Sequence, residues 1–143
     1  MVGILVTGHG NFATGMLSSL ELIAGNQEKL IGVDFIAADN EKSLEKKIIE
    51  AMDKLGEEIL VLTDLAGGSP FKVSAILSQK LENKKIAVIA GTNLGMLIEV
   101  SLCRGDMNVK ELVEFATNSG IGAIKSFEIK EKNENDFEEE DGI

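Results

Sequence analysis

Short apolar runs that alternate with segments of helical period are the feature that most constrains the fold of this chain. The runs at residues 3–6, 59–62 and 86–89 have the composition of strands buried on both faces, and residues 30–35 form a patchier fourth. Strands that alternate with helices favour right-handed crossovers and a mainly parallel sheet. The sequence therefore predicts a doubly wound α/β fold with helices on both faces, and with its chemistry in the loops that follow the strands.

The helices between these strands are indicated by local sequence signals. Ser69 followed by Pro70 is typical of an N-cap and a first helical residue, and predicts a helix that continues to about Leu81. Further helices are predicted over about 94–103 and 109–118. Two apolar stripes at helical spacing each end at a glycine, namely Phe12, Met16, Leu20 and Ile23 before Gly25, and Leu44, Ile48, Met52 and Leu55 before Gly56.

The length and composition of the chain limit the class of protein it can be. Its 143 residues favour one domain, and a hydrophobic fraction of 44% is enough for a core. No apolar run approaches the roughly 20 residues that span a bilayer, and the N-terminus lacks the basic region of a secretory signal. The single cysteine, Cys103, excludes an internal disulfide and a thiol-based zinc site. We therefore expect a cytoplasmic protein without direct membrane insertion.

The chain is acidic, and its charge is unevenly distributed. It has 24 acidic residues against 14 lysines and arginines, a net charge of −10, whereas nucleic acids and anionic membranes bind basic surfaces. Residues 131–143 contribute seven acids and one lysine, a net of −6. We therefore predict a folded domain over residues 1–130, an acidic disordered tail over residues 131–143, and no nucleic acid partner.

The only histidine, His9, lies between Gly8 and Gly10 directly after the first predicted strand. The flanking glycines leave room for another molecule to approach the imidazole. Such a histidine can be a general base or a metal ligand, or it can simply cap a turn. With no second histidine and no cysteine near it in sequence, a transition-metal site has few ligands, so we expect no metal and no cofactor.

The segment after the third predicted strand carries the next candidates. Because the ends of strands one and three can be neighbours in a parallel sheet, Asp64 can reach His9, fix its tautomer and leave the other ring nitrogen as a nucleophile. Gly67, Gly68 and Ser69 would then present backbone N–H groups at a helix start, which suits a phosphate. The alternatives are a loop carboxylate and an ordinary glycine turn with a serine cap.

Several familiar motifs are absent from the sequence. It contains neither the P-loop of nucleoside triphosphate enzymes nor the glycine pattern of dinucleotide-binding folds. Ser69, His9 and Asp64 could compose a hydrolase triad, but the residues around Ser69 are not those of a nucleophile elbow. The combination that remains favours phosphoryl transfer through a histidine without a bound nucleotide.

Three motifs together give the sequence a recognisable pattern: GHGNFA at 8–13, DLAGGSPF at 64–71 and AGTNLGMLIE at 90–99. In this order they closely resemble the IIA (EIIA) subunits of the mannose/fructose/sorbose/N-acetylgalactosamine family of the bacterial phosphoenolpyruvate-dependent sugar phosphotransferase system. Matching segments recur from residue 1 to about 130. The resemblance implies a phosphocarrier that accepts a phosphoryl group from phosphorylated HPr and passes it to a IIB subunit.

The resemblance also implies roles for particular residues. His9 matches the histidine that is phosphorylated, at Nε2 in the family, and Asp64 matches the aspartate that bonds the other ring nitrogen. Gly67, Gly68 and Ser69 match the loop around the phosphoryl group. The family fold has a four-stranded parallel sheet and an antiparallel fifth strand exchanged across a homodimer. Residues 123–129, which are compatible with a strand, are in the right place for that exchange.

Three other functions are compatible with parts of this pattern. The related phosphocarrier of the dihydroxyacetone kinase system has the same fold and histidine, but its loop after strand three resembles residues 67–71 less well. A regulatory module could use the glycine-rich loop to bind a phosphorylated metabolite. A receiver domain phosphorylated on Asp64 would need an acidic cluster after strand one, where this chain has Thr7 and Gly8 before His9.

Overall fold

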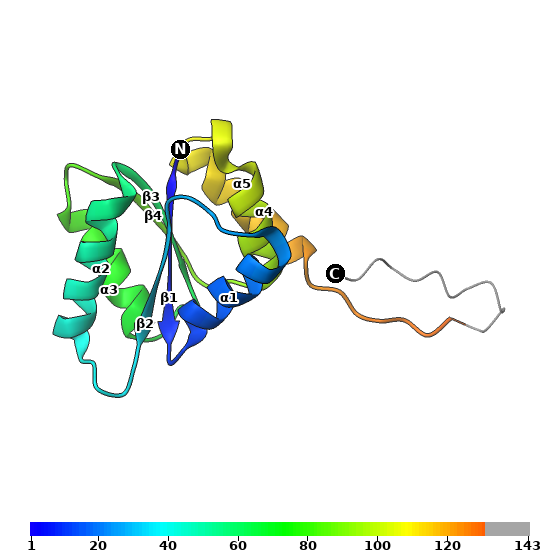
Figure 1. Cartoon of the computed structure of the whole chain (residues 1–143), viewed down its shortest axis with the longest axis horizontal. Coiled ribbons are helices and arrows are strands. Elements are labelled where there is room, and N and C mark those ends of the chain that lie inside the picture. The colour runs from blue at the N-terminus through cyan, green and yellow to red at the C-terminus, as the bar shows by residue number, and fades with distance from the viewer. Residues whose placement is uncertain (131–143) are drawn as a thin grey trace.

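The computed structural model describes residues 1–130 and has a parallel four-stranded sheet between two layers of helices (Figure 1). The strand order is β2-β1-β3-β4, and every pair of neighbouring strands is parallel. The predicted α/β fold with helices on both faces is therefore confirmed. The elements in chain order are β1 (Gly3–His9), α1 (Phe12–Ala24), β2 (Leu30–Phe35), α2 (Glu41–Leu55), β3 (Glu58–Thr63), α3 (Ser69–Lys80), β4 (Lys85–Ile89), α4 (Leu94–Cys103), a 3-10 turn (Arg104–Asp106) and α5 (Val109–Gly122).

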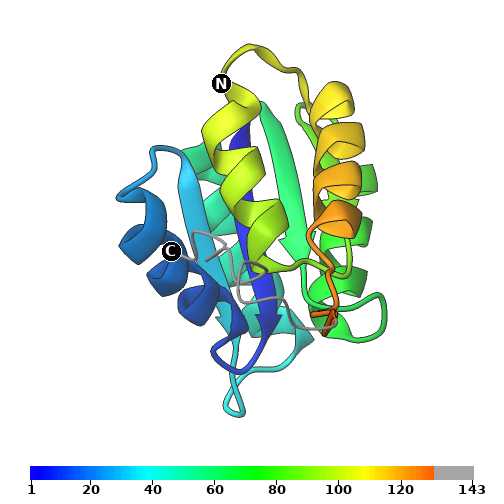
Figure 2. The ribbon, with the colours of Figure 1, turned by 90° about the vertical axis from the view of Figure 1, so that its right-hand side faces the viewer.

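The two central strands, β1 and β3, are buried on both faces because helices cover both sides of the sheet. Helices α1, α4 and α5 lie on one face, as Figure 2 shows, and α2 and α3 lie on the other. Successive residues of β1 alternate between the two cores: Ile4 and Val6 pack on the side of α1, α4 and α5, whereas Leu5 packs on the side of α2 and α3. This double burial explains why the strands are continuous apolar runs.

Helix α2 is defined by a capping box at its start and by an apolar stripe along its buried face. Asn40 accepts a hydrogen bond from the Ser43 N–H (2.9 Å), and the Ser43 hydroxyl accepts one from the Asn40 N–H (2.9 Å), which makes a capping box. The predicted stripe is buried, and the helix ends before Gly56, whose φ is 92°. The stripe and the stop predicted for α2 are thus confirmed. In α1, Leu20 is buried, Phe12 and Met16 pack against the core, and the helix ends before Gly25 as predicted.

The start of α3 differs from the sequence prediction. Ser69 is the first helical residue rather than the N-cap, and its hydroxyl makes no capping bond. The N-cap is Gly68, whose φ of 105° lies in a region that residues with a Cβ rarely adopt. Because the helix starts one residue earlier, Pro70 is the second helical residue rather than the first, but it stays in the first turn, where its missing N–H costs nothing.

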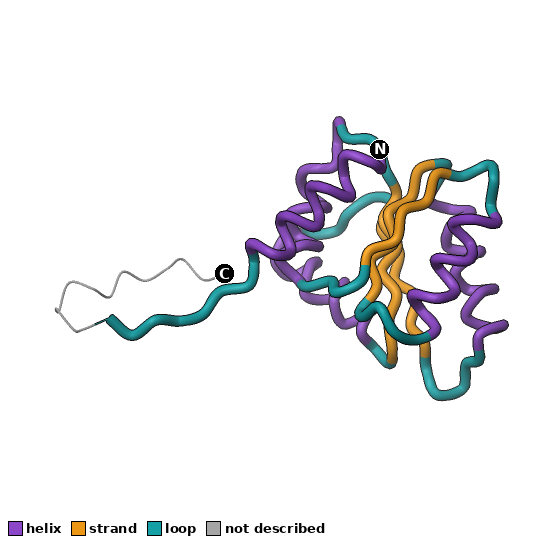
Figure 3. The backbone as a smooth tube through the Cα atoms, turned by 180° about the vertical axis from the view of Figure 1, so that it is seen from behind, coloured by secondary structure: helices purple, strands orange, loops and turns teal. Residues whose placement is uncertain are grey.

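The predicted antiparallel strand over residues 123–129 is not present among the described residues of this single chain. After Gly122 the chain leaves the domain without pairing to either edge of the sheet (Figure 3). Ile124, Phe127 and Ile129 are 75%, 85% and 86% exposed. A strand is stable only when its backbone pairs with a neighbouring strand, and residues 123–129 pair with neither edge strand of the sheet, β2 or β4. The predicted tail at residues 131–143 lies outside the described residues.

None of the helices described in residues 1–130 has the length and hydrophobicity required to cross a bilayer.

The loop between β2 and α2 is held together by Asp39. Its carboxylate accepts hydrogen bonds from the Lys47 ammonium (2.6 Å), the Ile36 N–H (3.0 Å) and the Ser43 hydroxyl (2.9 Å). The bond from Lys47, followed by those from Ile36 and Ser43, lowers the pKa of Asp39 from 3.8 to about 2. The ionised carboxylate therefore stabilises the folded state.

Replacing Asp39 by Asn should lower the melting temperature at neutral pH. Since the folded-state pKa is depressed, the stabilisation is complete above 3.8 and is lost as the pH falls towards about 2. The melting temperatures of Asp39→Asn and of the unmodified protein should therefore converge as the pH falls across that range. Asp53→Asn, at an exposed position on α2, is the control and should change little. A difference between Asp39→Asn and the unmodified protein that persists undiminished at pH 2 would contradict this assignment.

Candidate functional site

The strand order places the candidate site where neighbouring crossovers leave the sheet in opposite directions. From β1 the chain crosses to β2 on one side, and from β3 it crosses to β4 on the other. In open α/β sheets, ligands bind outside the carboxyl ends of the strands at such a position. His9 is the last residue of β1, and Asp64 follows directly after β3.

Asp64 holds His9 through both its backbone and its ring. One carboxylate oxygen, Oδ2, accepts a hydrogen bond from the His9 N–H (2.9 Å) and lies 2.7 Å from ring Nδ1. The other oxygen accepts from the Leu65 N–H (2.9 Å), so the carboxylate cannot rotate freely. A carboxylate only accepts at neutral pH, so the shared proton belongs to Nδ1 of His9 and Nε2 keeps its lone pair.

The position of Asp64 is itself fixed by the sheet. Its carbonyl accepts a hydrogen bond from the Gly91 N–H (3.1 Å), and the preceding Thr63 carbonyl accepts one from the Thr92 N–H (3.1 Å). These bonds tie the end of β3 to the loop that follows β4. The carboxylate of Asp64 is therefore presented on a rigid backbone rather than on a free loop.

Burial and hydrogen bonding act in opposite directions on Asp64. Partial burial raises the pKa of the carboxyl group, but the hydrogen bonds from the His9 N–H, the His9 ring and the Leu65 N–H together lower it more. The net result is a pKa below the ordinary value of 3.8, so Asp64 is an anion at neutral pH. A fixed anion against Nδ1 favours any state in which the His9 ring becomes positive.

The free nitrogen of His9 faces the loop before α3. A Cβ added to Gly68 would lie 2.7 Å from His9 Cε1 and 2.8 Å from Nε2, so only glycine allows this approach. A Cβ added to Gly8 would lie 2.5 Å from Phe12 Cδ1 and 3.0 Å from Asp64 Cγ. Both glycines are required by packing, and the imidazole stays accessible, since the His9 side chain is 45% exposed.

The start of α3 gives this face of His9 a positive potential. The first N–H groups of a helix have no partner within the helix, and they make its N-terminus a binding site for anions. Ser69 opens α3 with its hydroxyl directed to Glu41 Oε1 (3.4 Å). Gly67 and Gly68 precede it in the loop. The structure thus brings His9, Asp64 and this loop to one rim of the sheet.

Three residues at this rim were not identified from the sequence. Phe35 pairs with His9 in the β1–β2 register and stacks edge-on against its ring, with centroids 5.8 Å apart. Glu41 and Lys72 form an ion pair (3.1 Å) beside Ser69. The register could have indicated Phe35, but contacts between α2 and α3 leave no signal in the sequence.

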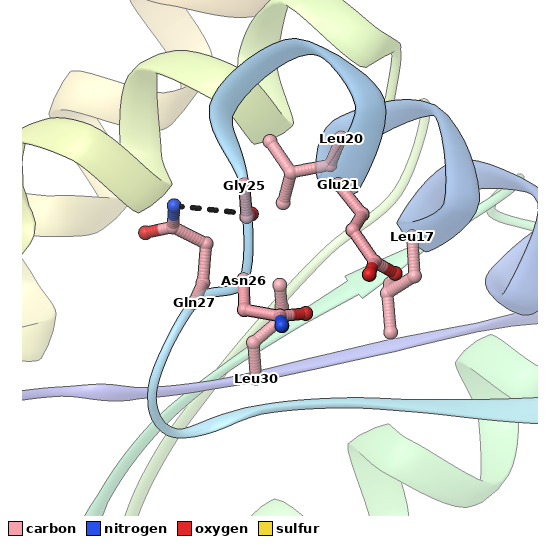
Figure 4. Close-up of a pocket in the computed structure, with 7 residues that line it drawn as sticks. All are labelled: Leu17, Leu20, Glu21, Gly25, Asn26, Gln27 and Leu30. Atoms are coloured by element: carbon pink, nitrogen blue, oxygen red, sulfur yellow. Dashed lines mark hydrogen bonds between the residues drawn. The ribbon is translucent and has the colours of Figure 1, made fainter.

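No group of three or more potential metal ligands is present in residues 1–130. A hollow of about 90 Å³ lies beside the C-terminal half of α1 (Figure 4). It borders Leu30 at the start of β2, whereas His9 lies at the opposite end of the sheet, next to the end of β2. It has room for a few water molecules, which occupy about 30 Å³ each. The candidate site is the rim around His9, where Asp64 and the start of α3 meet the ring.

Comparison with known proteins identifies the family. A family model described as the PTS system fructose IIA component matches residues 3–117. The crystal structure of phosphotransferase system component EIIA from Streptococcus agalactiae is 43% identical and superposes with a TM-score of 0.84 over 88% of this chain and 97% of that one. The fructose-specific EIIA component of Bacillus subtilis is 31% identical over 115 residues, which cover 79% of this chain and 77% of the relative.

One relative is much longer than this chain and matches it over only part of its length. The mannose-specific EIIAB component of Escherichia coli is 31% identical over 132 residues, which are 90% of this chain but only 40% of that protein. The fold and these matches define an EIIA phosphocarrier of a sugar-transporting phosphotransferase system. This chain belongs to its mannose family, as the three sequence motifs predicted.

Replacing Asp64 by Ala should remove the hydrogen bond that keeps the His9 ring protonated at Nδ1. Because the chain has one histidine, ¹⁵N NMR of the imidazole reports this site without overlap. The unmodified protein should show a protonated Nδ1 at neutral pH, and Asp64→Ala should shift the ring towards the Nε2–H form that predominates in a free histidine side chain. Phosphoryl transfer should slow by about 10²–10⁴-fold, as for loss of a group that assists a catalytic base. A ring already protonated at Nε2 in the unmodified protein would contradict the assigned hydrogen bond.

Proposed function

We propose that this chain accepts a phosphoryl group from phosphorylated HPr on Nε2 of His9 and passes it to a IIB subunit. The observation that carries the proposal is the bond from His9 Nδ1 to Asp64, which leaves an exposed Nε2 lone pair beside the start of α3. Membership of the mannose-family EIIA components supports the same partners. We also propose that the protein works in the cytoplasm, where these partners would meet it, with residues 1–130 as the functional domain.

The transfer step needs no proton to move. The Nε2 lone pair of His9 attacks the phosphorus of the donor's phosphohistidine, and the new N–P bond forms as the donor's N–P bond breaks. Nδ1 keeps its hydrogen, so the His9 ring gains the positive charge that the donor ring loses. Asp64 stabilises that charge, while the N–H groups at the start of α3 and the loop of Gly67, Gly68 and Ser69 stabilise the phosphoryl oxygens. In transfer to IIB, His9 is the leaving group, and the nucleophile of IIB attacks the phosphorus.

The proposed acceptor can be tested directly. With phosphoenolpyruvate and the general phosphotransferase proteins, the chain should gain one acid-labile phosphate, and His9→Ala should gain none. Cys103→Ser is the matched control, because it removes another exposed nucleophile and should label normally. Normal labelling of His9→Ala would overturn the site. A regulatory module that only binds a phosphorylated metabolite would show no covalent label in any variant.

We further propose a homodimer that exchanges the segment at residues 123–129. Ile124, Phe127 and Ile129 are largely exposed in the single chain, and both β2 and β4 are edge strands. Exposed edges and apolar segments favour association. Pairing with a second copy would satisfy the backbone of this segment, and exchange of an identical element is an inexpensive route to a dimer.

Deletion of residues 123–143 should give a monomer or an aggregate, whereas deletion of residues 131–143 alone should leave the dimer intact. The shorter deletion is the control, because it removes the acidic tail and retains the apolar segment. Light scattering coupled to size-exclusion chromatography measures the mass of each form. A full-length species with the mass of one chain at micromolar concentration would count against the dimer.

A further inference from the structure

A carboxylate from α2 joins two donors on α3 at the rim beside His9. Lys72 donates to both oxygens of Glu41, at 3.1 Å and 3.3 Å, and the Ser69 hydroxyl donates to Oε1 of the same carboxylate at 3.4 Å. Both donors therefore meet at one anionic oxygen.

Helix geometry explains why these two donors converge. Ser69 and Lys72 are three residues apart and share one face of α3. Side chains on a helix lean towards its N-terminus, so the ammonium of Lys72 reaches back over the first turn. That turn begins at Gly68, whose backbone lies against Nε2 of His9. A phosphoryl group on Nε2 would thus be next to the point where the two donors meet.

The pair of Glu41 and Lys72 is weak enough to be exchanged. Their side chains are 52% and 60% exposed, and exposed ion pairs of this kind contribute little to stability. A phosphoryl group carries more negative charge than a carboxylate and offers three acceptor oxygens. It would compete well for the same donors and would also repel the carboxylate of Glu41.

Assuming the proposed phosphorylation of His9, we propose that Lys72 binds the phosphoryl group and that Glu41 is its internal competitor. In the unphosphorylated protein Glu41 holds Lys72 and the Ser69 hydroxyl beside the site. On phosphorylation the two donors exchange this carboxylate for the phosphoryl oxygens. Lys72 thereby favours the phosphorylated form, and Glu41 limits how strongly the phosphoryl group is held, which suits a carrier that must release it again.

The test measures the equilibrium between phosphorylated HPr and this protein. Lys72→Gln should lower the equilibrium constant for phosphorylation by about two- to fivefold, the range expected for one exposed charge interaction. Lys72→Arg should restore it, and Glu41→Gln should change it in the opposite direction. The effect of Lys72→Gln should shrink as the salt concentration rises, because salt screens exposed charges. Melting curves of each variant establish that it is folded.

A second pair between the same two helices provides the matched control. Lys80 lies 3.9 Å from Glu45. Lys80 is about two turns further along α3 than Lys72, and Glu45 is about one turn further along α2 than Glu41. Lys80→Gln and Glu45→Gln make the same changes in charge and should leave the equilibrium unchanged. Equal effects of Lys72→Gln and Lys80→Gln, or no effect of either, would overturn the inference while leaving the proposed function intact. Failure of the unmodified protein to accept phosphate would instead overturn the proposed function, and this inference with it.

Discussion

The hydrogen bond between His9 Nδ1 and Asp64 Oδ2 is the interaction on which the rest of the site depends. It exists because β1 and β3 are adjacent and in a register that sets Thr7 opposite Thr63, so that the residues just beyond meet. A shift of one residue would turn every side chain of the strand to the other face, and close packing opposes it because residues fitted to one core would have to fit the other. The apolar core thus fixes the geometry of a polar contact at its edge.

The site combines a rigid support with an open reactive face. Asp64 is held by the Leu65 N–H and by the bond from Gly91 to its carbonyl, whereas His9 projects into solvent beside Gly68. A carrier that passes a group between two proteins needs both properties, because the imidazole must keep its orientation and yet be reached by two partners in turn. Glycine at positions 8 and 68 is the local consequence, since a Cβ at either would collide with the site.

The far end of the sheet is held by a different kind of contact. Arg104 is almost fully buried and donates to the backbone carbonyls of Val2, Glu28 and Lys29. Burial lowers the pKa of the guanidinium, and the charge of Glu28 partly offsets this effect. By satisfying carbonyls before β1 and β2, Arg104 joins the start of both strands to the turn after α4. It stabilises the frame without contacting the rim where His9 lies.

Much of this protein was determined by its sequence alone. The four apolar runs, the stripes ending at Gly25 and Gly56, and the three motifs predicted the layers, the parallel sheet and the family, because burial and helix ends are local consequences of residue type. Asp64 was likewise suggested as a partner of His9 by strand position. Local sequence patterns do not show, however, which surfaces contact each other in the folded protein. They also do not decide between alternative N-cap residues at the start of a helix.

Only the tertiary structure decided the remaining features. The N-cap of α3 is Gly68 rather than the predicted Ser69, because the backbone there has a φ of 105°, which glycine adopts without steric strain. The tertiary structure showed that residues 123–129 pair with neither edge strand of the sheet, β2 or β4, so this segment does not form a strand in the single chain. It also brought Glu41 from α2 to Lys72 on α3. Each of these depends on contacts between segments distant in sequence, and such contacts are set by packing rather than by local preference.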